Sequence, residues 1–178
     1  MAGGKTSAEK LNRTLLAIVQ ILRDNGITDW MIGYGTLLGL IRENSCIHND
    51  DDVDILCNRQ HYDELKRLLQ DGGFELVYNY GIGKSRNILK TKANDKFASV
   101  DIYMAEVEED GSFSDLWTKV VWSSCYVDRE QKSFVCLDWQ GAVLQLPDNS
   151  EEKLLNRYGD KWRVPQRNSG PKPQKRRI

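Results

Sequence analysis

The first part of the chain has apolar residues at helical spacing. They recur every three or four positions from Leu11 to Leu22, and the run ends at an Asn-Gly pair, 25–26. This spacing predicts an amphipathic helix. Thr6 and Glu9 form a capping-box pattern, which predicts that the helix begins at Thr6.

Short apolar runs rich in β-branched and aromatic residues predict strands. TDWMIGY (28–34) and DDVDILC (51–57) are two such runs, and TLLGLIREN (36–44) between them predicts a helix that starts at Thr36. This order of elements predicts a mixed α/β domain with a central sheet. The other expected elements are helices over 59–71 and 149–157 and strands over 74–80, 87–92, 97–105, 117–122 and 133–137.

The composition is typical of a folded globular domain. Of the 178 residues, 40% are hydrophobic and 29% charged, with only 14 Gly and 4 Pro. These values exclude collagen-like and largely disordered chains. A chain of this length forms one compact domain, which we place at residues 1–166.

Charge is divided unevenly along the chain. The net charge is −1, yet seven of the 25 basic residues follow Asp160, where no acidic residue occurs. The acidic body argues against extended nucleic acid as a partner, because Lys and Arg carry most phosphate binding. Residues 167–178 combine Pro, Gly and like charges, so we expect a mobile basic tail and favour a solvated terminus over a localisation signal.

Cysteine usage and hydropathy bear on the compartment. The four cysteines are too few for a disulfide scaffold, and none lies in a CxxC pair, which favours reduced thiols. No signal-peptide core and no apolar run long enough to span a membrane is present. We therefore expect a soluble, cytoplasmic chain.

Several familiar motifs are incomplete. A P-loop ending at Gly83-Lys84-Ser85 would need glycine at Tyr78, and a dinucleotide fingerprint would need glycine at Leu38. A calcium loop starting at Asp50 would need glycine at Ile55. The spacing of cysteines and histidines matches no zinc knuckle. These four ligand classes are disfavoured.

The strongest chemical signal is an acidic cluster of four carboxylates in five positions, Asp50, Asp51, Asp52 and Asp54. Side chains alternate in a strand, so Asp52 and Asp54 share one face about 7 Å apart by Cα, with Asp50 just upstream. Carboxylates this close repel one another unless cations neutralise them. Hard oxygen ligands suit Mg²⁺ or Mn²⁺ bridging to substrate phosphates. A solvated acidic loop is the alternative.

Two further features point to the same chemistry. Asp101 lies between apolar neighbours on a predicted strand and needs a partner, either a metal or a structural group. The predicted helix after Gly33-x-Gly35 begins at Thr36, and free N–H groups at a helix N-terminus bind phosphate. The Thr36 hydroxyl and Arg42 are expected to add a donor and a fixed charge.

These residues together resemble the LicD/fukutin family of nucleotidyltransferase-fold proteins. The resemblance rests on GTLLGLIR (35–42), IHNDDDVDI (47–55) and the closing segment EEKLLNRYGDKWRVP (151–165). The chain departs from the family at His48-Asn49, where Pro-Trp is usual, and at Glu43, where His is common. These departures concern the choice of substrate more than the fold.

The resemblance implies a nucleotidyltransferase-like mixed β-sheet flanked by helices. It implies a Mg²⁺ or Mn²⁺ site in which Asp52 and Asp54 hold the metal, Asp50 assists, and Asp101 completes the site and accepts a proton. Gly35, Thr36 and Arg42 would then hold phosphate oxygens. From the basic stretch between the acidic strands, Lys84 and Lys90 are expected to reach substrate phosphate, with a solvated strand face as the alternative.

The implied activity is transfer of a phospho-alcohol, such as phosphocholine or ribitol phosphate, from a CDP-linked donor to a glycan or other hydroxyl acceptor. In-line displacement at phosphorus depends on positioning and charge neutralisation, so these residues suffice without a covalent nucleophile. Two alternatives remain: nucleotidyl transfer from an NTP with release of pyrophosphate, and an inactive nucleotide-binding module of the same fold.

Overall fold

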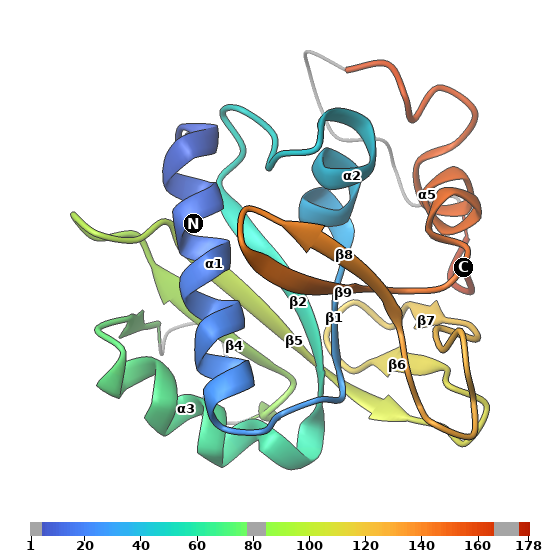
Figure 1. The fold of residues 1–178 in the computed structure, drawn as a ribbon, viewed down its shortest axis with the longest axis horizontal. Helices are drawn as coiled ribbons and strands as arrows, with labels where there is room; N and C mark the ends of the chain where they lie inside the picture. Colours follow the sequence, from blue (N-terminus) through green and yellow to red (C-terminus); the bar gives the residue numbers. More distant parts are fainter. Residues whose placement is uncertain (1–4, 78–84, 166–174) are drawn as a thin grey trace.

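The computed structural model describes residues 5–77, 85–165 and 175–178. A mixed β-sheet forms its centre, with helices packed around it (Figure 1). The helices are α1 (Ala8–Asp24), α2 (Tyr34–Glu43), α3 (Tyr62–Asp71) and α5 (Ser150–Tyr158), with a 3-10 turn η1 (Arg59–His61). The strands are β1 (Trp30–Ile32), β2 (Asp52–Asn58), β3 (Glu75–Leu76), β4 (Ile88–Lys92), β5 (Ser99–Val107), β6 (Phe113–Asp115), β7 (Val121–Trp122), β8 (Val135–Trp139) and β9 (Ala142–Leu146).

The sheet runs in the order β1-β2-β5-β4-β3, with β6 beside β5 and β7 beside β6. Strands β2 and β5 are parallel, and the other described pairs in this sheet are antiparallel. This arrangement confirms the predicted mixed sheet flanked by helices. It places the two central strands, which carry the predicted aspartates, side by side.

The N-cap of helix α1 lies one residue after the predicted cap. Ser7 is the N-cap, and its side chain accepts a hydrogen bond from the backbone N–H of Lys10. Thr6 instead pairs with the acidic loop: its N–H donates to the Asp50 carbonyl over 3.0 Å, and its carbonyl accepts from the Asn49 N–H over 3.0 Å. The capping prediction at Thr6 was wrong, because this backbone pairing takes precedence over a local side-chain cap.

Helix α2 begins earlier than predicted, and the strand before it is shorter. Strand β1 ends at Ile32, Gly33 is the N-cap, and Tyr34 opens the helix. The Tyr34 hydroxyl donates to Asp115 over 2.5 Å, which fastens the start of α2 to the end of β6. Gly35 and Thr36 therefore both lie in the first helical turn.

The hairpin of β8 and β9 contains a strand that the sequence pattern missed. Leu144 and Leu146 of β9 are buried, and the Gln145 side chain donates to the Trp30 carbonyl over 2.7 Å. The hairpin thereby lies alongside β1 (Figure 1). Trp122 and Trp139 are buried in the core.

The last four residues pair with β7. The Val121 N–H donates to the Arg176 carbonyl over 2.7 Å, the Ile178 N–H donates to the Val121 carbonyl over 2.8 Å, and Ile178 is buried. Ile178 packs within the hydrophobic core, and the mobility expected over 167–178 stays a prediction. The rest of that tail, 167–174, lies outside the described residues.

Two general expectations can be compared with the structure. All four cysteines are free thiols, and Cys46, Cys57 and Cys125 are buried. Within the described ranges, the helices are too short or too polar to cross a bilayer.

Candidate active site

Three charged side chains form a row across the centre of the sheet. The strand register pairs Asp54 of β2 with Asp101 of β5, and Asp101 with Lys90 of β4. Residues that are partners on adjacent strands point to the same face of the sheet. Asp54 and Asp101 are 5% and 4% exposed. Two carboxylates and one ammonium group therefore lie next to one another in a largely buried position.

The first turn of α2 holds Asp54. The Gly35 N–H donates to Oδ2 of Asp54 over 2.9 Å, and Oγ1 of Thr36 accepts from the Asp54 N–H over 2.8 Å. Thr36 is only 1% exposed. The N-terminal end of α2 therefore orients a carboxylate, which differs from the direct phosphate contact expected of Gly35 and Thr36.

Gly35 also explains how Asp50 reaches the site. A Cβ at position 35 would lie 2.9 Å from Oδ2 of Asp50 and 3.2 Å from Oδ2 of Asp54. Real Cβ atoms essentially never approach within 3.0 Å of a neighbouring atom. A side chain here would force the Asp50 carboxylate to move, so glycine lets both carboxylates pack against the bare backbone.

The loop before β2 adds Asp51 to the cluster. Carboxylate oxygens of Asp50, Asp51 and Asp52 all lie within 4.8 Å of one another. The sequence pattern left Asp51 out of the metal site, since strand alternation would turn it to the opposite face. Strand β2 begins at Asp52, so alternation does not govern position 51.

Asp101 provides the test of whether the site fits a cation. Its Oδ2 pairs with the Lys90 ammonium group. Its Oδ1 is buried and has no hydrogen-bond partner, and no other buried side-chain oxygen or nitrogen of the described residues lacks one. Asp52 is its neighbour, but two carboxylates hydrogen-bond only when one is protonated. Buried polar groups normally have partners. This unpartnered oxygen, among hard oxygen donors, fits a divalent cation such as Mg²⁺ or Mn²⁺.

Burial shifts the pKa of each carboxyl in the same direction. Burial and neighbouring negative charge raise the pKa of Asp50 to about 6 and that of Asp52 to about 8. The pKa values of Asp54 and Asp101 are also raised, chiefly by burial. The four carboxyls thus have too little positive charge near them to stabilise their ionised forms, and a divalent cation would supply that charge.

Comparison with known proteins agrees with this geometry. A family model described as LicD/FKTN/FKRP, nucleotidyltransferase domain, matches residues 26–147. The chain belongs to the LicD/FKTN/FKRP nucleotidyltransferase-domain family. The match includes α2, β2 and β5, which carry the aspartate site. No curated protein sequence matches the chain.

Solved structures show the fold that this LicD/FKTN/FKRP member shares. The lincomycin-bound lincosamide antibiotic adenylyltransferase LnuA is similar at 15% identity and TM-score 0.55, covering 84% of this chain and 85% of its own. The antibiotic-resistance factor ANT(2'')-Ia is 13% identical, with TM-score 0.55 and coverage of 91% and 77%. A nucleotidyltransferase-like antigen from Paracoccidioides brasiliensis is 18% identical, with TM-score 0.53 and coverage of 86% and 69%. The fold is therefore that of nucleotidyltransferases.

Two other basic residues of this LicD/FKTN/FKRP member, Arg42 and Lys92, pair with glutamates outside the aspartate cluster. Arg42 pairs with Glu43 over 2.7 Å in the last turn of α2, about 12 Å along the helix from its first residue. Lys92 pairs with Glu75 over 2.6 Å. Lys84 lies outside the described residues. Lys90 is the described member of the basic stretch that contacts a predicted site aspartate.

Two tyrosines belong to the site and were missed. The Tyr103 hydroxyl donates to Oδ1 of Asp54 over 3.2 Å, and its pKa is raised by burial and by the nearby aspartates. Tyr158, in the last turn of α5, has a pKa raised by burial and by Asp54 and Asp50. Tyr103 follows Asp101 by two positions, so strand alternation alone indicates its face. Nothing local in the sequence indicates Tyr158.

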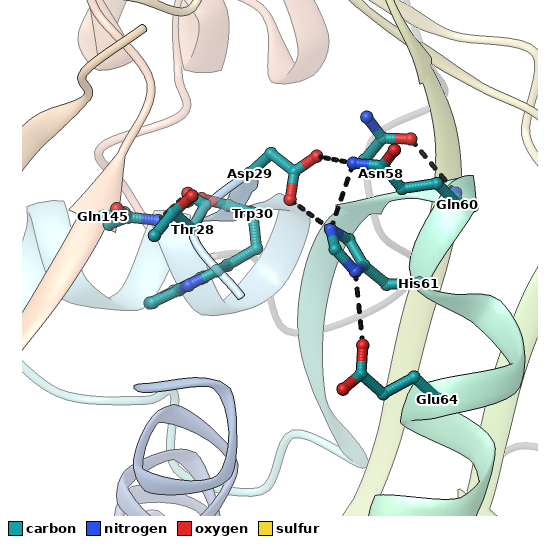
Figure 2. Close-up of polar contacts among 8 residues, drawn as sticks. All are labelled: Thr28, Asp29, Trp30, Asn58, Gln60, His61, Glu64 and Gln145. Atoms are coloured by element: carbon teal, nitrogen blue, oxygen red, sulfur yellow. Dashed lines mark hydrogen bonds and ion pairs between the residues drawn. The ribbon is translucent and has the colours of Figure 1, made fainter. Parts of the chain in front are cut away.

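A second polar cluster lies at the other end of β2. His61 Nε2 is 2.6 Å from Oδ1 of Asp29, and the Gln60 side chain donates to Oδ2 of Asp29 over 2.8 Å. Figure 2 shows the His61 ring between the carboxylates of Asp29 and Glu64, with Glu64 at 3.6 Å from Nδ1. These residues border a groove of about 710 Å³. Both oxygens of Asp29 have partners, unlike those of Asp101.

Proposed function

We propose that this LicD/FKTN/FKRP-family transferase moves a phospho-alcohol from a CDP-linked donor to a hydroxyl acceptor, in the presence of Mg²⁺ or Mn²⁺. The observation that carries the proposal is the buried, unpartnered Oδ1 of Asp101, a residue paired in register with Asp54 on the neighbouring central strand. Carboxylates arranged in this way can hold a divalent cation that neutralises the charge of a diphosphate.

The residues divide into ligands and supports. Asp50, Asp52, Asp54 and Asp101 would hold the metal, which supplies charge neutralisation at the donor diphosphate when bound. Asp54 is kept in place by Gly35, Thr36 and Tyr103. Gly35 and Tyr103 hold the carboxylate and Thr36 holds the backbone N–H, so Asp54 needs little reorganisation when substrate arrives, which favours catalysis.

The reaction is an in-line displacement at phosphorus. The acceptor oxygen forms a bond to the phosphorus of the phospho-alcohol, while the bond from that phosphorus to the bridging oxygen breaks and CMP leaves. The acceptor proton passes to Asp101, whose raised pKa suits it to accept a proton. The products are CMP and the phosphodiester of the acceptor.

Product analysis tests this assignment. The complete chain is incubated with Mg²⁺, a hydroxyl acceptor mixture and CDP-choline, CDP-ribitol, CDP-glycerol, CTP, UTP or ATP in separate reactions. Release of CMP from one CDP-alcohol, lost in the Asp101→Asn variant, supports the proposal. Pyrophosphate release from an NTP would replace it with nucleotidyl transfer.

Binding without turnover is the remaining outcome. Ligands that bind only the folded protein raise its melting temperature. If CDP ligands raise the melting temperature with Mg²⁺ but neither CMP nor pyrophosphate is released, the chain is an inactive nucleotide-binding module.

A further inference from the structure

Lys90 occupies an unusual position for a strand lysine. Its ammonium group pairs with Oδ2 of Asp101, and its side chain is only 21% exposed. The partner carboxylate is 6% exposed. The pair lies on the same sheet face as Asp54, and Lys90 supplies positive charge where Asp101 and Asp52 lack it.

Lys92, two residues further along β4, offers a direct contrast. Alternation places Lys90 and Lys92 on the same face of the strand. Lys92 pairs with Glu75 at the surface, and its side chain is 63% exposed. Pairs exposed to this degree contribute little to stability. The same residue type on the same strand face is thus a surface group at position 92 and a counter-ion of the aspartates at position 90.

We infer that Lys90 is a displaceable counter-ion that competes with the divalent cation for Asp101. In the metal-free protein the ammonium group neutralises and orients Asp101 through Oδ2, leaving Oδ1 free. Cation binding at Asp101 weakens the attraction between Asp101 and Lys90, because like charges repel. The released ammonium group then contacts a donor phosphate oxygen. This inference rests on the proposed function and gives Lys90 two roles, lowering the affinity for free metal and contacting the donor phosphate.

Equilibrium Mn²⁺ binding to the nucleotide-free, full-length protein tests the inference. Free Mn²⁺ is measured by electron paramagnetic resonance at pH 8 for wild type, Lys90→Gln and the matched control Lys92→Gln. Glutamine retains a hydrogen-bond donor but carries no charge, and both variants change the net charge equally. We expect Lys90→Gln to bind Mn²⁺ about three- to tenfold more tightly than wild type, with Lys92→Gln within about twofold of wild type.

A double variant locates the effect. In Lys90→Gln/Asp101→Asn the gain over Asp101→Asn alone should vanish, because the competition takes place at Asp101. Equal or weaker Mn²⁺ binding by Lys90→Gln overturns the inference, and so does a gain that persists in the Asp101→Asn background. If Lys90→Gln does not fold, Lys90→Met gives the same comparison.

Turnover provides an independent readout of the released ammonium group. Lys90→Gln should saturate at lower metal concentration than wild type while its KM for the donor rises about fivefold or more, because a charged phosphate contact is lost. An unchanged donor KM would overturn the phosphate contact. Because Mn²⁺ binding requires no reaction, its failure is distinguishable from failure of the proposed transfer.

Discussion

A polar cluster containing carboxylates lies at each end of β2. One cluster is complete, in that both oxygens of its central carboxylate have partners, and the other is incomplete. At the Asn58 end, both oxygens of Asp29 have partners, and His61 lies between two carboxylates (Figure 2). At the Asp52 end, Asp54 and Asp101 are more deeply buried, and Oδ1 of Asp101 has no partner. The more deeply buried carboxylates therefore lie at the end of β2 where their negative charge is less well neutralised.

This contrast distinguishes a structural cluster from a ligand site. Satisfied polar groups stabilise a fold and need nothing further. A buried carboxylate without a partner lowers stability unless a ligand completes it. A groove adjoins the Asp29 cluster, whereas the incomplete cluster contains the IHNDDDVDI segment (47–55) on which the family resemblance rests. The unpartnered oxygen of Asp101 is therefore the feature that singles out the candidate active site.

The largest expected effect is the loss of turnover when a carboxylate of the incomplete cluster is neutralised. Asp54→Asn should lower kcat by at least about 100-fold, because a metal ligand and a pre-oriented charge are lost. Folding should be retained, since the neutral amide removes a buried charge whose pKa burial raises. Turnover assays and circular dichroism measure both effects. Turnover near wild type would remove Asp54 from the site.

A smaller but substantial effect is expected from displacing the carboxylates. Gly35→Ala introduces a Cβ 2.9 Å from Oδ2 of Asp50, so this carboxylate must move. We expect kcat/KM to fall by about 10- to 100-fold, as misplaced catalytic groups typically cause. Steady-state kinetics checks this, with the melting temperature as the control for folding. Unaltered kinetics would show that the position of Asp50 does not matter.

The free energy of unfolding should depend on pH through the buried carboxyls at the Asp52 end of β2. The folded-state pKa of Asp50 is about 6 and that of Asp52 about 8, both above the ordinary value near 3.8. The folded protein therefore binds more protons than the unfolded chain. Its free energy of unfolding falls as pH rises from near 3.8 to about 6 for Asp50 and to about 8 for Asp52.

Thermal unfolding in EDTA measures this loss. The melting temperature should fall from pH 5.5 to 8.5, and excess Mg²⁺ should reduce the fall. Asp52→Asn should flatten the upper part of the curve. A melting temperature that rises over this range in EDTA would contradict the charge account.

The smallest effect is expected at the complete end. Asp29→Asn removes the charge facing His61, and we expect it to lower the free energy of unfolding by about 1 kcal/mol. Turnover should stay within about twofold of wild type, which makes this variant the matched control for Asp54→Asn. Urea unfolding and turnover assays measure the two quantities. A large loss of turnover would place the Asp29 cluster in the active site.

Sequence patterns predicted what depends on local periodicity. The two-residue alternation placed Asp52 and Asp54 on one strand face, and Asp101 between apolar neighbours on another strand, before any contact was known. The pairing of Lys90 with Asp101 depends on the register of β4 against β5, which periodicity does not fix. Tyr158 comes from the last helix and reaches the site only through tertiary packing.

Small shifts at element ends change the local interpretation. Strand β2 starts at Asp52, one residue later than predicted, so Asp51 lies in the preceding loop. Helix α2 starts at Tyr34 and not at Thr36, and the Thr36 hydroxyl accepts from the Asp54 N–H, while its phosphate contact stays a prediction. In both cases a shift of one or two residues changes what a side chain faces.

The central claim is that the incomplete aspartate cluster binds a divalent cation. Isothermal titration of Mn²⁺ into metal-free protein with CDP present tests it most directly. We expect wild type and Asp29→Asn to bind Mn²⁺ with similar affinity and Asp101→Asn to bind at least about tenfold more weakly. Mn²⁺ binding by Asp101→Asn that equals wild type, or no binding by wild type, would contradict the account.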